Sequence, residues 1–219
     1  MTRRLVLLSG ISGDGRLFST LNIPQANVLT PSHVYPQRGE TLVDYAERVA
    51  DAHEIGPDDV IGGASYGGML AGQIASRRKV AGLIVLGSCL KPAKLPRSYH
   101  WMERVGRALP NPILMMRTWG PVMKLGLSPM TDEGQAILRA MARDFNPRVL
   151  RRFGRMIVQW PGVETPACPT LVLHGDKDVV IPPRCAQPHR VIKNAGHCFT
   201  LTHAEETSAA IAAFLAGLA

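Results

Sequence analysis

Several features that define common protein classes are scarce in this 219-residue sequence. No apolar run approaches the roughly 20 residues that a bilayer-spanning helix needs. Aromatic residues make up only 5% of the chain, and no recognised nucleic-acid-binding motif is present. These absences argue against a membrane span and against nucleic-acid binding. With 46% hydrophobic and 19% charged residues, the composition is typical of a single globular domain.

Cysteines are few, and their spacing is uninformative for metal binding. The four are Cys89, Cys168, Cys185 and Cys198. None lies in a C-x-x-C pair, and the spacing matches no structural zinc site. We therefore expect free thiols, no metal and no organic cofactor. Cys198 adjoins a histidine in sequence, but catalytic Cys and His meet in space rather than as chain neighbours, so it is a poor candidate nucleophile.

The N-terminus lacks the long apolar segment of a secretory signal. Arg3 and Arg4 are followed by only four apolar residues, 5–8, before Ser9 and Gly10. A signal peptide has a longer apolar region and a small-residue cleavage site. The short run is typical of a buried first strand, and together with the free thiols it predicts a cytoplasmic protein.

Charge is unevenly distributed along the chain. The formal net charge is +8, yet residues 91–155 hold thirteen basic and four acidic residues, and the rest of the chain carries −1. Within this segment, Arg148, Arg151, Arg152 and Arg155 have the i, i+3, i+4 and i+7 spacing of one helix side. Such a stripe is a candidate contact for an acidic carrier protein or coenzyme A, or it is merely a solvated surface.

Short apolar strands alternate with amphipathic helices over most of the chain. We expect strands at 5–8, 27–31, 59–64, 80–86, 170–174 and 189–193, with helices at 41–53, 67–77 and the C-terminus. This alternation predicts an α/β fold: a mostly parallel sheet with helices on both faces. Thr202 and Glu205 suggest a capping box for the last helix.

The alternation is interrupted in the middle of the chain. Residues 89–160 show no convincing strand, hold many prolines, and include a clear amphipathic helix near 132–145 with Thr131 as its N-cap. We therefore divide the chain into a core, 1–88 and 161–219, and a helical lid insertion, 89–160. Ligands bind beyond the carboxyl ends of the strands in such sheets, so an insertion that leaves from there would cover the site.

A candidate nucleophile lies where an apolar strand leads into a helix. Gly63-Ala64-Ser65-Tyr66-Gly67 matches the G-x-S-x-G pattern, in which a sharp turn presents the serine above the sheet. Serine needs a base to take its proton. His197 is the best candidate because it follows the last strand and a short turn, whereas His203 lies at the start of the final helix.

A carboxylate must orient such a base, and two are available. Asp176 and Asp178 both follow the strand at 170–174, and either could reach His197, leaving the other to cap the turn before Pro182. The chain order is then Ser, Asp, His. Backbone N–H groups of the loop after the first strand and of Tyr66 are candidates for an oxyanion hole, which would hold the negative charge of a tetrahedral intermediate.

In this order and context, the residues resemble the α/β-hydrolase superfamily over nearly the whole chain. The resemblance implies Asp178 as the acid, because the family's acid usually matches the second aspartate of a G-D-x-D segment. The family's oxyanion loop usually reads His-Gly-x; here Ser9-Gly10-Ile11 matches by position but lacks the histidine. Ile11 N–H is then the expected donor, with Ser12 as the alternative.

The expected activity is hydrolysis of small-molecule carboxylic esters by a carboxylesterase, through an acyl-enzyme on Ser65. An alternative within hydrolases is a carrier-protein- or coenzyme A-linked methyl ester or thioester that docks through the basic lid. An alternative of another class is a binding protein that keeps the fold without turnover. The sequence leaves acyl group, alcohol and oligomeric state open.

Overall fold

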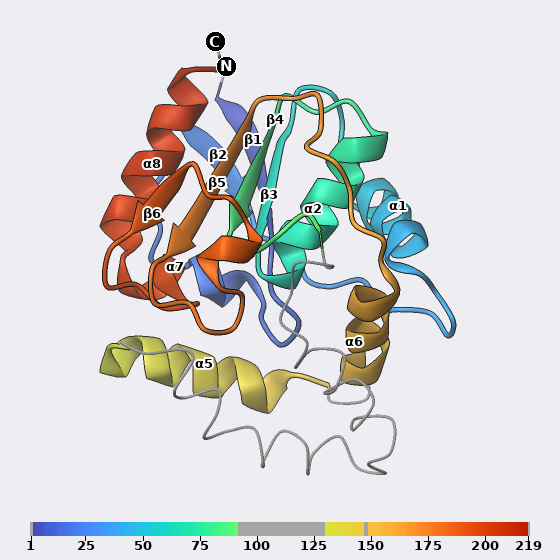
Figure 1. Ribbon diagram of the computed structural model, residues 1–219, viewed down its shortest axis with the longest axis horizontal. Coiled ribbons are helices and arrows are strands. Elements are labelled where there is room, and N and C mark those ends of the chain that lie inside the picture. Colours follow the sequence, from blue (N-terminus) through green and yellow to red (C-terminus); the bar gives the residue numbers. More distant parts are fainter. Residues whose placement is uncertain (1, 92–129, 147–148, 219) are drawn as a thin grey trace.

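The computed structural model describes residues 2–91, 130–146 and 149–218. One six-stranded sheet forms its centre, with strand order β2-β1-β3-β4-β5-β6 (Figure 1). The strands are β1 (Arg3–Leu8), β2 (Ala26–Leu29), β3 (Val60–Ala64), β4 (Gly82–Leu86), β5 (Thr170–Gly175) and β6 (Arg190–Ile192). All neighbouring strands are parallel, so the predicted fold class is confirmed and the sheet is parallel throughout.

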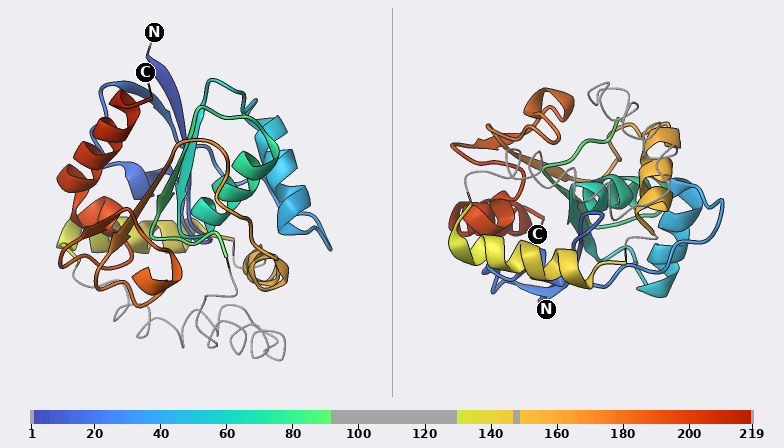
Figure 2. Two further views of the ribbon diagram at one scale, coloured as in Figure 1. Left: turned by 45° about the horizontal axis from the view of Figure 1, so that its top comes forward. Right: turned by 90° about the horizontal axis from the view of Figure 1, so that it is seen from below.

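Helices cover both faces of this sheet. The α-helices are α1 (Leu42–Ala52), α2 (Tyr66–Arg77), α5 (Asp132–Asp144), α6 (Leu150–Gln159), α7 (Phe199–Thr202) and α8 (Ala204–Ala216). The described residues also include two short 3-10 helices, η1 (Gly15–Phe18) and η4 (Pro183–Cys185). Two views show α1 and α2 against one face of the sheet and α8 against the other (Figures 1 and 2).

The sequence explains why these elements form. Every residue of β3 and β4 is buried, as expected for apolar runs covered on both sides. Helix α1 begins at a capped end, because the Thr41 hydroxyl accepts a hydrogen bond from the Asp44 N–H. Its buried apolar residues recur at helical spacing, and α1 packs mainly against α2.

The buried apolar residues form two clusters, one on each face of the sheet. The first joins α1, α2 and α6 to the sheet and includes Tyr45, Tyr66 and Phe153. The second joins η1, α7 and α8 to the opposite face and includes Phe199 and Ile211. The sheet is therefore fixed from both sides, which holds the ends of its strands in place.

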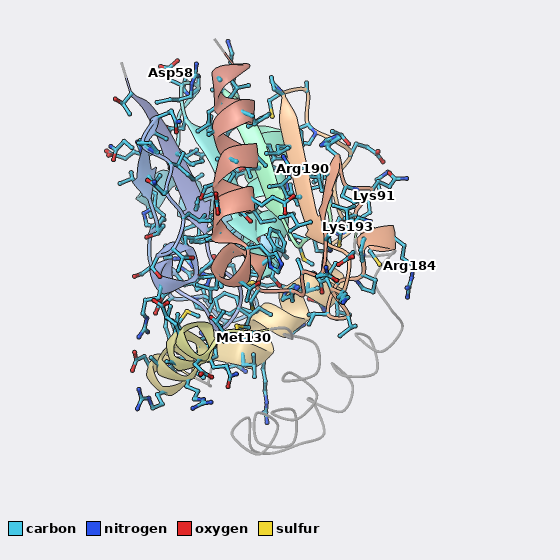
Figure 3. All side chains as sticks on the ribbon, turned by 90° about the vertical axis from the view of Figure 1, so that its left-hand side faces the viewer. Asp58, Lys91, Met130, Arg184, Arg190 and Lys193 are labelled. Atoms are coloured by element: carbon cyan, nitrogen blue, oxygen red, sulfur yellow. The ribbon has the colours of Figure 1, made fainter. Side chains whose placement is uncertain are left out.

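Helices α5 and α6 lie beyond the carboxyl ends of the strands (Figures 1 and 2). Asp58, which precedes β3, and Met130, which precedes α5, lie at opposite ends of the sheet (Figure 3). The described parts of the predicted insertion contain helices and no strand. Residues 92–129 lie outside the described part, so the boundaries at 89 and 160 stay a prediction.

Candidate active site

Ser65 occupies a strained turn between β3 and α2. Its backbone has φ 55° and ψ −121°, a conformation that non-glycine residues rarely adopt. Two contacts hold it: the Ser65 N–H donates to the Leu86 carbonyl at 3.0 Å, and the Ser88 hydroxyl donates to the Ser65 carbonyl at 2.5 Å. Ser65 is partly exposed between buried neighbours, so the turn presents its hydroxyl.

The glycines of the motif allow β1 and α2 to meet at this turn. A Cβ atom on Gly67 would overlap the Leu8 carbonyl, and one on Gly63 would lie 2.5 Å from the same oxygen. Contacts this short with backbone cannot be relieved by rotating a side chain. The G-x-S-x-G pattern is therefore explained by close backbone approach as well as by the turn.

His197 and Asp178 meet at the same edge of the sheet. His197 lies in the loop between β6 and α7, and Asp178 follows β5. His197 Nδ1 lies 2.8 Å from Asp178 Oδ2. An ionised carboxylate only accepts, so Nδ1 carries the proton and Nε2 of the neutral ring is the acceptor. Gly175 permits this contact, because a Cβ there would overlap the Ala195 carbonyl in the His197 loop.

The Asp178 carboxylate is buried but well supplied with donors. Its Oδ1 accepts the N–H groups of Val180 and Ile181, both at 2.9 Å, and His174 Nε2 lies 3.3 Å from Oδ2. Burial by itself raises the pKa of Asp178. The electrostatic interaction with His197 and the hydrogen bonds from His174, His197 and Ile181 outweigh burial and lower the pKa of Asp178 to about 2. The group is therefore ionised at neutral pH.

Asp176 and His203, the alternative acid and base, take no part in the contact between Asp178 and His197. Asp176 is exposed, and its Oδ1 accepts the Ala195 N–H at 3.1 Å. The expectation that the aspartate not paired with His197 caps the turn before Pro182 is wrong, since Asp178, which pairs with His197, also accepts the N–H groups of that turn. His203 bonds with the Thr202 hydroxyl at the start of α8.

Ser65 and His197 both lie around Gly87, at the end of β4. Gly87 follows Leu86, which binds Ser65, and a Cβ on Gly87 would lie 3.5 Å from Asp178 Oδ2 and 3.4 Å from the His197 carbonyl. Among the described residues, no hydrogen bond joins the Ser65 hydroxyl to His197. Such bonds are often long without substrate and tighten in the complex.

The expected oxyanion donors lie on either side of the nucleophile. Tyr66 is the first residue of α2, so its N–H has no partner within the helix. Ile11 lies in a turn that is closed by the Gly13 N–H donating to the Gly10 carbonyl at 3.0 Å. Gly10 packs against Ser65: a Cβ on Gly10 would lie 4.0 Å from Ser65 Oγ.

Three supporting residues were not predicted from the sequence. Ser88 fixes the Ser65 carbonyl, and His174, fully buried, donates from Nε2 to the Ile181 carbonyl at 2.6 Å beside Asp178. His33 Nε2 lies 2.9 Å from the Gly10 carbonyl. The sequence held one signal for His33: the oxyanion loop has a serine where the resembling family has a histidine.

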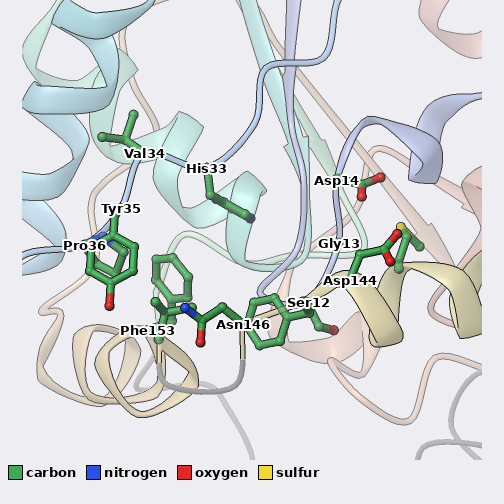
Figure 4. Close-up of a pocket in the computed structure, with 13 residues that line it drawn as sticks. Ser12, Gly13, Asp14, His33, Val34, Tyr35, Pro36, Asp144, Asn146 and Phe153 are labelled. Carbon is green, nitrogen blue, oxygen red and sulfur yellow. The ribbon is translucent and has the colours of Figure 1, made fainter.

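A pocket of about 200 Å³ adjoins the oxyanion loop (Figure 4). Ser12 and Gly13 form one wall, His33 and Phe153 line another, and the end of α5 near Asp144 lines a third. Ser65 is not among its lining residues. The pocket therefore lies beside the oxyanion loop rather than over the nucleophile.

The predicted arginine stripe is divided in the structure. Arg151 and Arg155 on α6 are exposed, whereas Arg148 lies outside the described residues. Arg152 donates to the Pro36 carbonyl and lies over the Tyr35 ring, 5.3 Å from its centroid. Arg152 therefore joins α6 to the loop that carries His33.

The described residues bring together no group of three or more side chains suited to a metal ion, and none of their helices is long and apolar enough to cross a membrane. None of the four cysteines, all of them in the described part of the chain, forms a disulfide. Burial raises the pKa of Cys198 to about 12, which disfavours the reactive thiolate.

Ser65 lies on a strand-to-helix turn, and the Asp178–His197 pair lies at the same edge of a parallel sheet. This arrangement is typical of hydrolases with an α/β fold. The chain belongs to the alpha/beta hydrolase family, whose model matches residues 5–210. No curated protein matches the chain by sequence.

Solved structures share this fold at low sequence identity. A thermophilic esterase from Thermogutta terrifontis is 21% identical with a TM-score of 0.79, covering 99% of this chain and 90% of its own. A hydrolase from Oleispira antarctica is 15% identical with a TM-score of 0.74, covering 98% and 91%. A thioesterase of prodiginine biosynthesis from Streptomyces coelicolor is 20% identical with a TM-score of 0.68, covering 97% and 90%.

Proposed function

We propose that this protein is a serine hydrolase that cleaves carboxylic esters through an acyl-enzyme. The observation that carries the proposal is the 2.8 Å contact between His197 Nδ1 and the buried Asp178 carboxylate, at the edge of the sheet where Ser65 sits in its strained turn. Family membership and the esterase among the similar structures support the same reaction class.

In the proposed reaction, Ser65 Oγ attacks the ester carbonyl while His197 Nε2 takes its proton. Asp178 keeps the proton on Nδ1 and stabilises the imidazolium that forms. The Ile11 and Tyr66 N–H groups bind the oxyanion. Collapse of the intermediate expels the alcohol, which receives the proton from His197. Water then attacks the acyl-enzyme by the same route and releases the acid.

The test compares Ser65→Ala and His197→Ala with the wild type on p-nitrophenyl esters of increasing acyl length. We expect each variant to lose at least about ten thousandfold in kcat, since removal of one such residue disables the whole unit. His203→Ala is the matched control, because His203 lies beyond α7 and its ring contacts the Thr202 hydroxyl rather than Asp178. A Ser65→Ala variant with a tenth of the wild-type rate would contradict the proposal.

The same variants separate an enzyme from a binding protein. A fluorophosphonate probe should label the wild type on Ser65, because an activated serine attacks the phosphorus atom. Ser65→Ala should remain unlabelled. A folded wild type that neither labels nor hydrolyses any ester would favour a binding protein with this fold.

A second candidate substrate is an acyl group held as a thioester or methyl ester on an acidic carrier or coenzyme A. Arg151 and Arg155 are exposed on α6, a helix without acidic residues, so positive charge lies beyond the carboxyl ends of the strands. A thioesterase is among the similar structures. Complementary charge acts mainly on the association rate.

We expect Arg151→Glu with Arg155→Glu to lower kcat/KM for the carrier-bound substrate by at least about tenfold at low salt, with little change on a neutral ester. Arg152 is left in place because it packs against Tyr35. The matched control is Arg77→Glu with Lys79→Glu, which reverses two exposed charges at the opposite end of the sheet. Equal effects of the two pairs would exclude docking through α6.

A further inference from the structure

His33, in the loop between β2 and α1, reaches across to the loop that follows β1. Its Nε2 lies 2.9 Å from the Gly10 carbonyl oxygen and 3.1 Å from Ser9 Oγ. A carbonyl oxygen only accepts hydrogen bonds, so the Nε2 atom carries the proton and donates it to Gly10. Figure 4 shows the His33 ring on the side of the pocket that faces the Gly13–Asp14 segment.

The oxyanion loop has one self-consistent set of hydrogen bonds around this ring. The Ser9 hydroxyl donates to the Gly13 carbonyl at 2.8 Å, and it is therefore available to accept from His33. The Gly13 N–H donates to the Gly10 carbonyl at 3.0 Å. The Gly10 oxygen thus accepts two bonds, one from within the loop and one from His33. Two donors from different directions hold this oxygen more firmly than the turn alone would.

Holding the Gly10 oxygen also fixes the direction of the next N–H. The Gly10 C=O and the Ile11 N–H belong to one planar trans peptide and point in opposite directions. Any rotation of this peptide that turned the Ile11 N–H would break the bond to His33. Gly10 itself packs against the nucleophile, since a Cβ there would lie 3.5 Å from Ser65 Cβ. His33 therefore acts on the peptide that lies beside Ser65.

The His33 ring is itself held by aromatic packing. Its centroid lies 5.2 Å from that of Phe153 on α6 and 6.3 Å from that of Tyr66 on α2. Burial lowers the pKa of His33, against the opposing effects of the Gly10 carbonyl and Asp14. A neutral ring donates from one nitrogen, and the Gly10 oxygen accepts the hydrogen bond from that N–H.

We infer that His33 is a positioning residue of the oxyanion hole: it orients the Gly10–Ile11 peptide so that the Ile11 N–H meets the developing oxyanion. The inference rests on the proposed ester hydrolysis. His33 reaches this peptide from a different loop, and its Nε2 also lies 3.1 Å from Ser9 Oγ. A bond to the carbonyl also polarises the peptide and strengthens its N–H as a donor.

The test replaces His33 by leucine, glutamine and asparagine. Leucine fills the space without a donor. Glutamine places an amide N–H near the position of Nε2, whereas the shorter asparagine does not reach it. We expect His33→Leu and His33→Asn to lose about tenfold to a hundredfold in kcat. This loss does not exceed the one that follows removal of an oxyanion donor. KM should change less than about threefold, and His33→Gln should recover most of the lost rate.

Inhibition by a transition-state analogue gives a second measurement. A merely structural role of His33 would leave the inhibition constant unchanged. A trifluoromethyl ketone forms a hemiketal with a catalytic serine and places its oxyanion in the hole. Its inhibition constant should rise by the same factor as kcat/KM falls across the three variants. Rates are expressed per active site, titrated with a fluorophosphonate, so that misfolded protein is not counted. His53→Leu is the matched control, since His53 is also a partly buried histidine whose pKa burial lowers, and it lies outside the site.

Unchanged kcat per active site in His33→Asn, or equal losses in His33→Gln and His33→Asn, would overturn the role of His33. If His33→Leu fails to fold, the glutamine and asparagine pair decides the question. Failure of the proposed function gives a different result: Ser65→Ala then keeps the wild-type rate, and the role assigned to His33 falls with it. An inactive Ser65→Ala beside a fully active His33→Asn contradicts the role of His33 alone.

Discussion

At the residue scale, two aspartates that are neighbours in sequence have different surroundings. Asp178 is buried against His197 and two backbone N–H groups, and Asp176 is exposed and binds one N–H of the neighbouring loop. The strand before them ends at Gly175, so small differences in the turn decide which carboxylate points inward. The structure therefore agrees with the aspartate that the family resemblance implied, which apolar spacing alone had left open.

We expect Asp178→Asn to lower kcat for an ester by about a thousandfold to ten thousandfold, because an amide can hold His197 in the wrong tautomer. Asp176→Asn should stay within about threefold of the wild type, since an amide oxygen can still accept the Ala195 N–H. Steady-state kinetics on one p-nitrophenyl ester would measure both. A larger loss at Asp176 would reverse the assignment.

At the scale of elements, helix starts were predicted where a polar cap precedes a regular apolar face. Thr131 caps α5 through the Gly134 N–H, as its sequence position predicts. The capping box expected from Thr202 and Glu205 is wrong. Thr202 ends the short helix α7, and α8 begins at Ala204 after His203. Phe199 and Leu201 of α7 are buried in the second apolar cluster, so α7 packs against the core before α8 begins.

Gly67 lies where β1, β3 and α2 meet, and a side chain at this position should destabilise the protein. We expect Gly67→Ala to lower the free energy of unfolding by at least about 3 kcal/mol, because its Cβ would overlap the Leu8 carbonyl and backbone must move. Gly154→Ala in α6 is the matched control, with open space around the added Cβ. That variant should be neutral or more stable by up to about 1 kcal/mol, since alanine favours helix.

Urea unfolding monitored by circular dichroism would measure both glycine variants. A Gly67→Ala protein as stable as the wild type would show that β1 and α2 can separate at the nucleophile turn without cost.

At the scale of the whole molecule, the buried Asp178 makes stability depend on pH. The pKa of Asp178 is about 2 in the folded protein and about 3.9 when unfolded. Its ionised form is therefore favoured by folding. The resulting stabilisation is complete above about pH 4 and is lost as pH falls through about 2.

We expect the wild type to lose about 2 kcal/mol more of its free energy of unfolding than Asp178→Asn between pH 5 and pH 2. The asparagine cannot ionise, so the variant lacks this contribution. Urea midpoints at half-unit pH intervals would measure the difference. Parallel curves for the two proteins would contradict the depressed pKa.

The sequence by itself determined the parallel sheet, most helix and strand positions, and the order of Ser65, an aspartate and His197 along the chain. These follow from the spacing of apolar residues and from turn residues after each strand, which are local properties. Tertiary structure decided that Asp178 rather than Asp176 meets His197, that Ser88 holds the Ser65 turn, and that His33 binds the Gly10 carbonyl. Each of these contacts joins separate segments of the chain, so it depends on how the loops at the carboxyl edge pack, and no local pattern encodes that packing.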